Sequence, residues 1–431
     1  MTRTYKAFLK GCALFLVTAL LIFSFCACSQ EEKEVGLNLS KSINLVTSGP
    51  GEDASTSAVI SWHAKYLNSV LEYKKAGDSQ YTVMNVKGVQ STSNWTDKVS
   101  FYRCRVELSD LTPDTDYTYR VKSSDGTVSS EAKFRTAGTD KTFSFLWLSD
   151  LHVPKGSVTD MNRIKKLVNY ANTKDGIDVD FCLFTGDMVN KGQNYKHWNY
   201  WADSGVLNAM EYAFLPGNHE YYQNDDPDKK RYSNCYFLDV AAHPYNNVCN
   251  GKSVTKSDYW FLWNDVLFVN IDSMAPEATK VSETVAKQKA WFEEVVKLNA
   301  GKYTYLVVSQ HYAYILNKEE TWGEYESWYP LFDQYKVDFA LGSDSHEYAR
   351  SKPLVNNQPQ EGGTIYLSSA MTQGSLSVID PILDLDSRCA FYGGGVSGGC
   401  YFTVTPEKMV MHLIGYNGNE YDSVEVSPKS R

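Results

Sequence analysis

Polar side chains with metal-binding or proton-transfer chemistry stand just after several apolar runs of the sequence. They are Asp150 and His152 after 143–149, Asp187 after 179–185, Asn218, His219 and Glu220 after 211–217, His311 after 304–310, and Asp344 and His346 after 337–343. Each of these positions supplies oxygen or imidazole nitrogen and none supplies a thiolate, which suits Zn, Fe, Mn and similar ions. Carboxylates do not gather within a few ångströms of one another unless cations neutralise them.

The positions of these residues along the chain allow them to meet at one site. They span nearly 200 residues of sequence, yet they meet in space if the apolar runs are neighbouring strands, because ligands bind at the carboxyl ends of strands in open α/β sheets. Two ions about 3.5–4 Å apart that share one carboxylate form the arrangement that holds both oxygens of an in-line phosphoryl displacement.

The elements that must position these residues are buried strands alternating with helices. Apolar runs recur at 143–149, 179–185, 211–217, 266–273, 304–310 and 337–343. Between them, 158–172 and 283–299 carry apolar residues at helical spacing. This alternation predicts a layered α/β domain over 142–427, with 136–141 as the linker that precedes it.

The preceding region has a different pattern. Between residues 42 and 137, short runs alternate apolar and polar residues at 57–64, 69–77, 101–108, 116–126 and 131–136, which predicts a small all-β sandwich. Tyr117 and Tyr119 open one of these runs after a Pro-Asp turn, in the manner of a tyrosine corner. The segment resembles a fibronectin type III-like module.

The ordered motifs Asp150-Leu151-His152, Gly186-Asp187, Gly217-Asn218-His219-Glu220, His311 and His346 resemble the calcineurin-like metallophosphoesterase family. With the preceding sandwich, the chain is similar to the purple acid phosphatase-like branch of that family. The resemblance covers residue 42 to the C-terminal region. It implies a four-layer α/β (α+β) metallophosphoesterase sandwich preceded by the fibronectin III-like, purple acid phosphatase N-terminal-like domain.

The resemblance also implies a role for each motif residue. The first metal would be held by Asp150, His152, Asp187 and His346. Asp187 would bridge to a second metal completed by Asn218, His311 and Asp344. His219 would contact the phosphate and protonate the leaving oxygen, and Glu220 would orient His219. The cofactors implied are two divalent or mixed ions, with Fe, Zn or Mn expected and Mg or Ca as alternatives at the second position.

The sequence departs from the family pattern at two positions, and His152 is a further difference from the true purple enzymes. True purple enzymes carry a tyrosine three residues after the bridging Asp, where this chain has Asn190, so the protein is expected to be colourless. They also replace the residue at the position of His152. The family's final motif is G-H-x-H, whereas this chain reads Ser343-Asp344-Ser345-His346. Asp344 therefore puts a carboxylate where the family has an imidazole.

The first residues indicate export. Basic residues precede an apolar run from Cys12 to Ala27, and the polar segment from Cys28 to residue 41 follows, which is typical of a signal peptide over 1–27. Ala27-Cys28 resembles a bacterial lipobox, which implies lipidation of Cys28 and attachment to the cell membrane or outer membrane. The alternatives are an uncleaved membrane anchor or plain secretion.

The amino-acid composition limits the kinds of binding partner that the protein can have. Hydrophobic residues make up 43% of the 431 residues, which is ordinary for a globular protein. The net charge of −9 argues against a nucleic-acid-binding surface, because such binding depends on basic patches. Cys182 lies in an apolar run and is expected to be buried. Cys235–Cys249 and Cys389–Cys400 are candidate local disulfides, with unpaired thiols as the alternative.

These observations predict an extracytoplasmic, lipid-anchored binuclear phosphoesterase that acts on a small phosphorylated substrate. The resemblance implies hydrolysis of phosphate monoesters by a metal-bridging hydroxide. One alternative is a phosphodiesterase acting on nucleotides or cell-envelope phosphodiesters. The other is a non-catalytic surface-binding lipoprotein with a degenerate metal site, which the loss of the family's histidine at Asp344 favours.

Overall fold

The computed structural model describes residues 34–431 except 92–96, 155–157, 175, 177, 222–235, 250–251, 254, 276–280, 317–323, 371, 373–385 and 395–396. It divides into two units, Met1–Gly36 and Leu37–Arg431, and the sheets described below belong to the second. The predicted signal peptide, Cys28 and Cys235 lie outside the described residues. No helix in the part of the chain that the structure describes has the length and apolar character needed to cross a membrane.

The N-terminal region folds as two four-stranded sheets that enclose a small core. One sheet has the order β1 (Ile43–Pro50), β2 (Ala58–Ala64), β6 (Tyr102–Leu108), β5 (Val89–Gln90). The other has the order β4 (Thr82–Lys87), β3 (Asn68–Lys75), β7 (Asp116–Ser123), β8 (Ala132–Arg135). Trp62, Leu71 and Tyr119 are fully buried between them. The Tyr117 hydroxyl accepts a hydrogen bond from the Thr112 amide at 2.9 Å, as expected for a tyrosine corner.

β1 and β2 are buried on both faces, although their sequences alternate. The reason is that the larger domain covers their outer side. Thr47 donates a hydrogen bond to the carbonyl of Val240 at 2.8 Å, and Ser61 donates one to the carbonyl of Asp239 at 3.2 Å. These two acceptors lie in α4 (Phe237–Val240), so the contact joins the sandwich to the domain that carries the candidate site.

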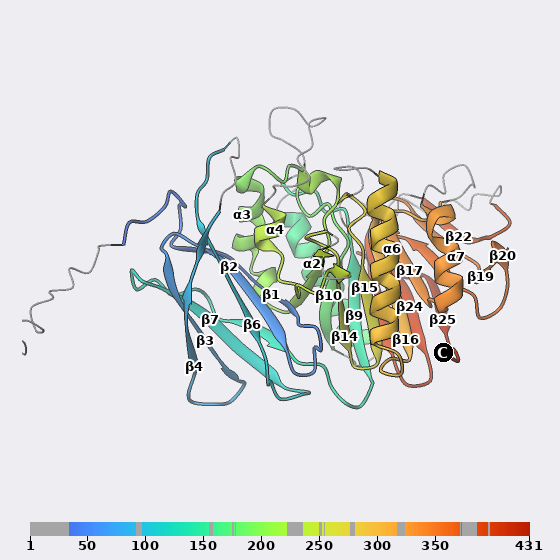
Figure 1. Cartoon of the computed structure of the whole chain (residues 1–431), viewed down its shortest axis with the longest axis horizontal. Coiled ribbons are helices and arrows are strands. Elements are labelled where there is room, and N and C mark those ends of the chain that lie inside the picture. Colours follow the sequence, from blue (N-terminus) through green and yellow to red (C-terminus); the bar gives the residue numbers. More distant parts are fainter. Residues whose placement is uncertain are drawn as a thin grey trace, which may run out of the picture. The chain divides into compact units, whose positions relative to one another are not determined.

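The larger domain contains two mixed sheets packed face to face (Figure 1). The first has the order β11 (Glu211–Phe214), β10 (Val179–Phe184), β9 (Phe143–Leu148), β23 (Gly398–Val404), β24 (Met409–Gly415), β25 (Glu420–Val426). The second has the order β14 (Tyr259–Trp263), β15 (Val266–Asn270), β16 (Tyr305–Tyr312), β17 (Phe339–Ser343), β21 (Ile365–Ser368), β18 (Tyr348–Ser351), β22 (Cys389–Gly394). Short elements complete it: η1 (Val206–Asn208), β12 (Val248–Cys249), β13 (Lys252–Ser253), β19 (Leu354–Val355) and β20 (Gln358–Pro359).

Aromatic side chains fill the space between the two sheets. Phe145 stacks on Phe181 and Phe402 of its own sheet, with ring centroids 5.3 and 4.5 Å away. It meets Phe268 of the other sheet edge to face at 5.2 Å. Burial of such rings is a large part of the free energy that holds two sheets together. This aromatic layer fixes the position of one sheet relative to the other.

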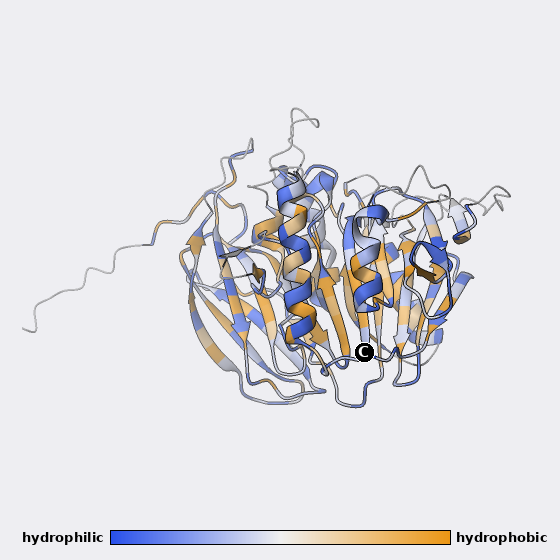
Figure 2. Ribbon diagram, turned by 45° about the vertical axis from the view of Figure 1, so that its right-hand side comes forward, coloured by the Kyte–Doolittle hydropathy of each residue, from blue (hydrophilic) through white to orange (hydrophobic). Residues whose placement is uncertain are grey.

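Helices cover the two outer faces. α2 (Val158–Lys174) and α3 (Tyr195–Ser204) pack on the first sheet, and α6 (Val281–Leu298) and α7 (Tyr325–Tyr335) pack on the second. Figure 2 shows the strands as largely hydrophobic and the helices as mixed, as expected for helices with one face in solvent. The predicted four-layer α/β sandwich is therefore confirmed.

One candidate disulfide is wrong. Cys389 and Cys400 are both free, buried thiols. Cys389 begins β22 in the second sheet, whereas Cys400 lies in β23 of the first, so the fold puts the two residues in different layers. The candidate pair Cys235–Cys249 has its first member outside the described residues. Cys182 is buried in β10, as predicted.

Candidate metal centre

The candidate ligands come from the carboxyl ends of strands in both sheets. β9, β10 and β11 are parallel neighbours in the first sheet, and β16 and β17 are parallel neighbours in the second. Asp150 and His152 follow β9, Asp187 follows β10, Asn218 begins η2 (Asn218–Tyr221) after β11, and Asp344 and His346 follow β17. The structure therefore brings the predicted metal ligands together where the ends of the two sheets meet.

His311 differs from expectation in its local setting. It was predicted to follow a strand, but β16 extends to Tyr312 and contains it. The pairing of β16 with β17 shifts register between Ser309 and Tyr312, which marks a bulge or a similar irregularity at this point. A bulge redirects a side chain while the strand continues. This explains how a residue inside β16 joins residues that follow the other strands.

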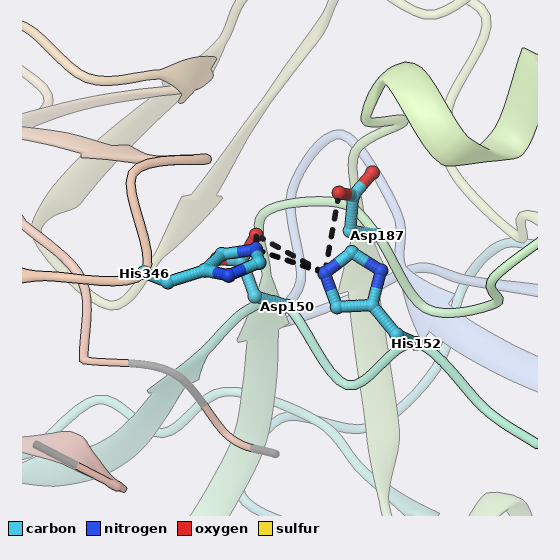
Figure 3. A group of neighbouring side chains, drawn as sticks. All are labelled: Asp150, His152, Asp187 and His346. Carbon is cyan, nitrogen blue, oxygen red and sulfur yellow. Dashed lines mark hydrogen bonds and ion pairs between the residues drawn. The ribbon is translucent and has the colours of Figure 1, made fainter. Parts of the chain in front are cut away.

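Asp150, His152, Asp187 and His346 form the first group of donors, whose ligand atoms lie within 4.8 Å of one another (Figure 3). Nε2 of His152 is 3.0 Å from Nε2 of His346 and 3.5 Å from Oδ2 of Asp187. Nε2 of His346 is 3.4 Å from Oδ1 of Asp150. Ligands held tetrahedrally at about 2.0–2.1 Å from one ion are about 3.3–3.4 Å apart, so this spacing fits a single metal ion.

The burial of Asp150 supports that interpretation. Its side chain is completely buried, and neither carboxylate oxygen has a hydrogen-bond partner of normal geometry among the described residues. A buried carboxylate without a hydrogen bond is costly unless a cation compensates it. A metal ion bound between these side chains would supply that compensation.

Asp187, His311 and Asp344 form the second group, which shares Asp187 with the first. Nε2 of His311 is 3.5 Å from Oδ1 of Asp187 and 3.5 Å from Oδ1 of Asp344. It is 3.2 Å from Oδ1 of Asn218. Nδ1 of His311 is 2.7 Å from the carbonyl oxygen of Thr185, to which it donates, so Nε2 is left to face the three oxygens.

Backbone geometry also separates these residues from their neighbours. Asp150, His152, Asp187, Asp344 and His346 all have positive φ, from 48° to 67°. Such left-handed conformations are uncommon outside glycine and concentrate at functional sites. Gly217 is required by close approach, because a Cβ there would lie 2.2 Å from Oδ1 of Asp187.

The charges in the centre are strongly coupled. Burial raises the pKa of Asp187 well above its ordinary value, against the attraction of His311. Burial lowers the pKa of His311, but Asp187, Asp344 and Asp150 more than offset this and raise it to about 10. The attraction between these carboxylates and His311 shows that the centre concentrates negative charge, which a bound cation would neutralise. Burial lowers the pKa of His152 to about 3, so this ring is the neutral imidazole that metal binding requires.

His219 lies beside both groups and belongs to neither. Its Nδ1 donates to the carbonyl of Asn190 at 2.8 Å, and its Nε2 is 3.9 Å from Oδ2 of Asp187. Its ring centroid is 4.4 Å from that of His152. The side chain is 23% exposed, so Nε2 faces the centre while the ring remains open to solvent on one side.

Glu220 has a different role from the one expected. Its carboxylate accepts hydrogen bonds from the backbone amides of Asp187, Val189 and Gly217, at 2.8, 3.2 and 2.7 Å. These bonds go to the loops around the centre rather than to the His219 imidazole, which the Asn190 carbonyl orients. The prediction that Glu220 orients His219 is therefore wrong. Glu220 fixes the loop that carries Asp187.

The remaining histidines lie away from the centre. His63, His197 and His243 are buried, and His412 hydrogen-bonds Glu420 between β24 and β25. Tyr221 and Tyr314 are also buried, so both are packing residues.

Three supporting residues were not foreseen. The Thr185 carbonyl accepts from His311, and the Asn190 carbonyl accepts from His219. A backbone carbonyl has no sequence signal, so neither contact was predictable. Asp422 in β25 accepts from the Tyr348 hydroxyl at 2.7 Å and from Arg350 Nε and Nη2 at 2.7 and 2.9 Å. This cluster ties β18, which follows His346, to the other sheet.

Both regions of the chain are similar in sequence to known protein families. Residues 143–348 match the calcineurin-like phosphoesterase family, and residues 44–136 match the purple acid phosphatase N-terminal domain. Two uncharacterized Mycobacterium tuberculosis proteins are each 26% identical over 335 residues, covering 70% of this chain and 61% of theirs. The match to purple acid phosphatase 21 of Arabidopsis thaliana is 22% identical over 275 residues, covering 61% of this chain and 56% of that one. The match thus spans about three fifths of these relatives.

Solved structures share the fold. The purple acid phosphatase PPD1 from yellow lupin seeds has a TM-score of 0.67 at 15% identity, covering 90% of this chain and 74% of its own. The structure of PhoD has a TM-score of 0.62 at 13% identity, covering 90% of both chains. At this identity the similarity shows the architecture alone.

Proposed function

Because this chain joins a calcineurin-like metallophosphoesterase domain to a purple acid phosphatase N-terminal domain, we propose that it is a metal-dependent hydrolase of phosphate monoesters. The observation that carries the proposal is the sharing of Asp187 by two groups of metal-binding side chains. A shared carboxylate supports a binuclear centre, and such a centre suits in-line displacement at phosphorus. The similarity to purple acid phosphatases favours monoesters over diesters.

The donor atoms determine what each position does. Asp150, His152, Asp187 and His346 would hold one ion, and Asp187, Asn218, His311 and Asp344 would hold the other. When bound, the two ions would supply Lewis acidity toward the phosphate and an activated water. Thr185 keeps His311 in the tautomer whose Nε2 is available as a ligand.

His219 is placed to complete the reaction. Its Nδ1–H is committed to the Asn190 carbonyl, so a proton on Nε2 is the one available for transfer. When the bond between phosphorus and the ester oxygen breaks, that oxygen takes the proton from Nε2 and leaves as the alcohol. His219 and His346 are partly exposed, so solutes can reach these two side chains from the solvent.

Activity after metal removal tests the proposal. Protein stripped with a chelator and then reloaded with Zn²⁺, Mn²⁺ or Fe²⁺ should hydrolyse p-nitrophenyl phosphate faster than bis-p-nitrophenyl phosphate, and stripped protein should hydrolyse neither. Faster hydrolysis of the diester would make the protein a phosphodiesterase. Inactivity toward both esters with every metal would favour the non-catalytic alternative.

The N-terminal segment supports a proposal about where in the cell the protein works. We propose that the protein works outside the cytoplasm, with Cys28 lipidated after removal of residues 1–27, because a basic and then apolar leader precedes that cysteine. Cys28→Ala should convert membrane-bound protein to soluble protein in cell fractions. Unchanged membrane association would contradict the lipid anchor.

A further inference from the structure

We infer that the two metal positions are chemically unequal, and that Asp344 makes the second position selective for a hard, oxygen-preferring ion such as Mn²⁺ or Mg²⁺. This inference rests on the proposed binuclear centre and specifies which ion each half would take. It depends on the residue at which this chain departs from the G-H-x-H pattern of the family.

The two groups of metal-binding side chains contain different types of donor atom. The first group contains two imidazoles and two carboxylates. The second contains one imidazole and two carboxylates, together with the amide oxygen of Asn218 beside it. Imidazole-rich sets suit Zn²⁺ and Fe²⁺, whereas sets dominated by carboxylate, carbonyl and water suit Mg²⁺, Ca²⁺ and Mn²⁺.

The Asp344 carboxylate lies beside the second metal position. Its Oδ1 is as close to His311 Nε2 as Oδ1 of Asp187 is, at 3.5 Å in each case. The residues on either side of Asp344 are held. Ser343 donates to the Thr185 carbonyl at 3.1 Å, and Ser345 Oγ lies 2.8 Å from Ser368 Oγ. Asp344 thus faces the second position from a fixed loop.

The side chain of Asp344 is more exposed to solvent than the other two carboxylates of the centre. The side chain of Asp344 is 37% exposed, whereas those of Asp150 and Asp187 are 0% and 2% exposed. The second position is therefore open to water on the side of Asp344. Mg²⁺ keeps several water ligands when it binds to proteins, so an open position rich in oxygen accommodates its hydration.

The carboxylate of Asp344 also changes the net charge of the centre. Asp150, Asp187 and Asp344 give the centre three carboxylates, one more than the family pattern with histidine at this place. Two divalent ions then leave a net charge of about +1 from these groups. An additional anionic oxygen at the second position strengthens its preference for a hard cation over one that favours nitrogen.

Metal binding tests this inference without any substrate. Stripped protein is equilibrated with equal Zn²⁺ and Mn²⁺, separated from free metal, and analysed for both elements. Wild type should retain one Zn²⁺ and one Mn²⁺ per chain. The echo-modulation spectrum of the bound Mn²⁺ should show one imidazole nitrogen ligand, from His311, because the first position would show two.

Two substitutions at Asp344 and one control complete the test. Asp344→His should bind two Zn²⁺ per chain and show an Mn²⁺ affinity reduced more than tenfold. Asp344→Asn, which keeps the shape and removes the charge, should also lose Mn²⁺ affinity more than tenfold and keep Zn²⁺ at the first position. Glu347→Gln removes a carboxylate of the same loop that belongs to neither donor group, and should behave as wild type.

The outcomes separate this inference from the proposed function. Two Zn²⁺ per chain in wild type, two imidazoles around Mn²⁺, or unchanged Mn²⁺ affinity in both Asp344 variants would overturn it. The expected metal distribution in a protein that hydrolyses no phosphate ester would leave the inference standing and refute the proposed function. Ester hydrolysis by a centre with two equivalent metal positions would support the proposed function and overturn this inference.

Discussion

The carboxylate of Glu220 lies directly against the backbone of Asp187. Its Oε2 accepts from the Asp187 amide at 2.8 Å and also from the Gly217 amide at 2.7 Å. Glu220 is completely buried, so these bonds are shielded from water. One side chain therefore holds together the loop that carries the shared carboxylate and the turn that presents Asn218 and His219.

Glu220→Gln should weaken metal binding although Glu220 is not a ligand. The amide offers one acceptor oxygen in place of two, so at least one backbone N–H of these loops loses its partner. Loss of a group that supports a metal ligand typically costs 10–100-fold in metal affinity. Isothermal titration with Zn²⁺ measures this, and an affinity equal to that of wild type would contradict the supporting role.

Asp187→Ala should remove both metals together, because its oxygens face both donor groups. Asp150→Ala is the matched comparison, since Asp150 belongs to the first group alone, and this variant should keep the second metal. Elemental analysis of the purified variants gives the metal content per chain. Two retained metals in Asp187→Ala would show that this carboxylate does not bridge them.

His219→Ala should separate metal binding from turnover. Metal content should stay at the wild-type level, because His219 is in neither donor group. Turnover should fall by about 10²–10⁴, the usual contribution of a general acid. Nitrophenyl phosphate needs less protonation of its leaving group than an alkyl phosphate does, so it should lose less. Equal losses on the two esters would argue against the acid role.

Asp422→Asn should destabilise the fold near His346. Asp422 pairs with Arg350, and their side chains are 8% and 15% exposed. Removing one partner of a buried ion pair costs about 3–5 kcal/mol of unfolding free energy. Glu425 lies on the same strand and pairs with Lys408 at an exposed site, so Glu425→Gln should cost less than about 1 kcal/mol. Urea unfolding compares the two, and equal effects would refute the prediction.

Asp180→Asn should stabilise the protein at alkaline pH. Burial raises the pKa of Asp180 from 3.8 to about 7, although Ser144 and Arg135 oppose this, and Asp178 and Asp140 add to the increase. The folded protein therefore keeps a proton that the unfolded chain releases. This stabilising effect is complete below about pH 4 and is lost as the pH rises to 7.

The expected change is thus near zero at pH 4 and a gain of up to roughly 4 kcal/mol at pH 8. Thermal unfolding of wild type and variant across this range provides the measurement. Glu211, whose pKa is also raised by burial, keeps part of the pH dependence in the variant. An equal effect of the substitution at both pH values would show that Asp180 does not titrate in this range.

The sequence was most informative where metal-binding side chains directly follow predicted strands. Asp150 and Asp187 each follow an apolar run, and parallel strands bring such positions to one edge, so their meeting was predictable. The division of the site between two sheets was not, because an apolar run does not reveal which sheet it joins. The same limitation explains the wrong pairing of Cys389 with Cys400.

The hydrogen bonds that support the centre could not be predicted from the sequence either. Glu220 was assigned to the neighbouring His219, yet its partners are amides of residues as distant as Asp187. Asp422 lies in a strand of mixed polarity, and nothing in that pattern indicates a partner 72 residues away at Arg350. Hydrogen bonds of this kind depend on the final packing of the layers.

The left-handed backbone at five candidate ligands has a consequence for laboratory evolution. A non-glycine residue in this conformation costs about 1 kcal/mol or more relative to glycine, so these five positions lose stability in return for the side chains that the centre needs. Selection for heat resistance alone should therefore enrich glycine at positions 150, 152, 187, 344 and 346, whereas selection for catalysis should reject it. Sequencing the survivors of both selections would locate the centre without a substrate or a metal assay.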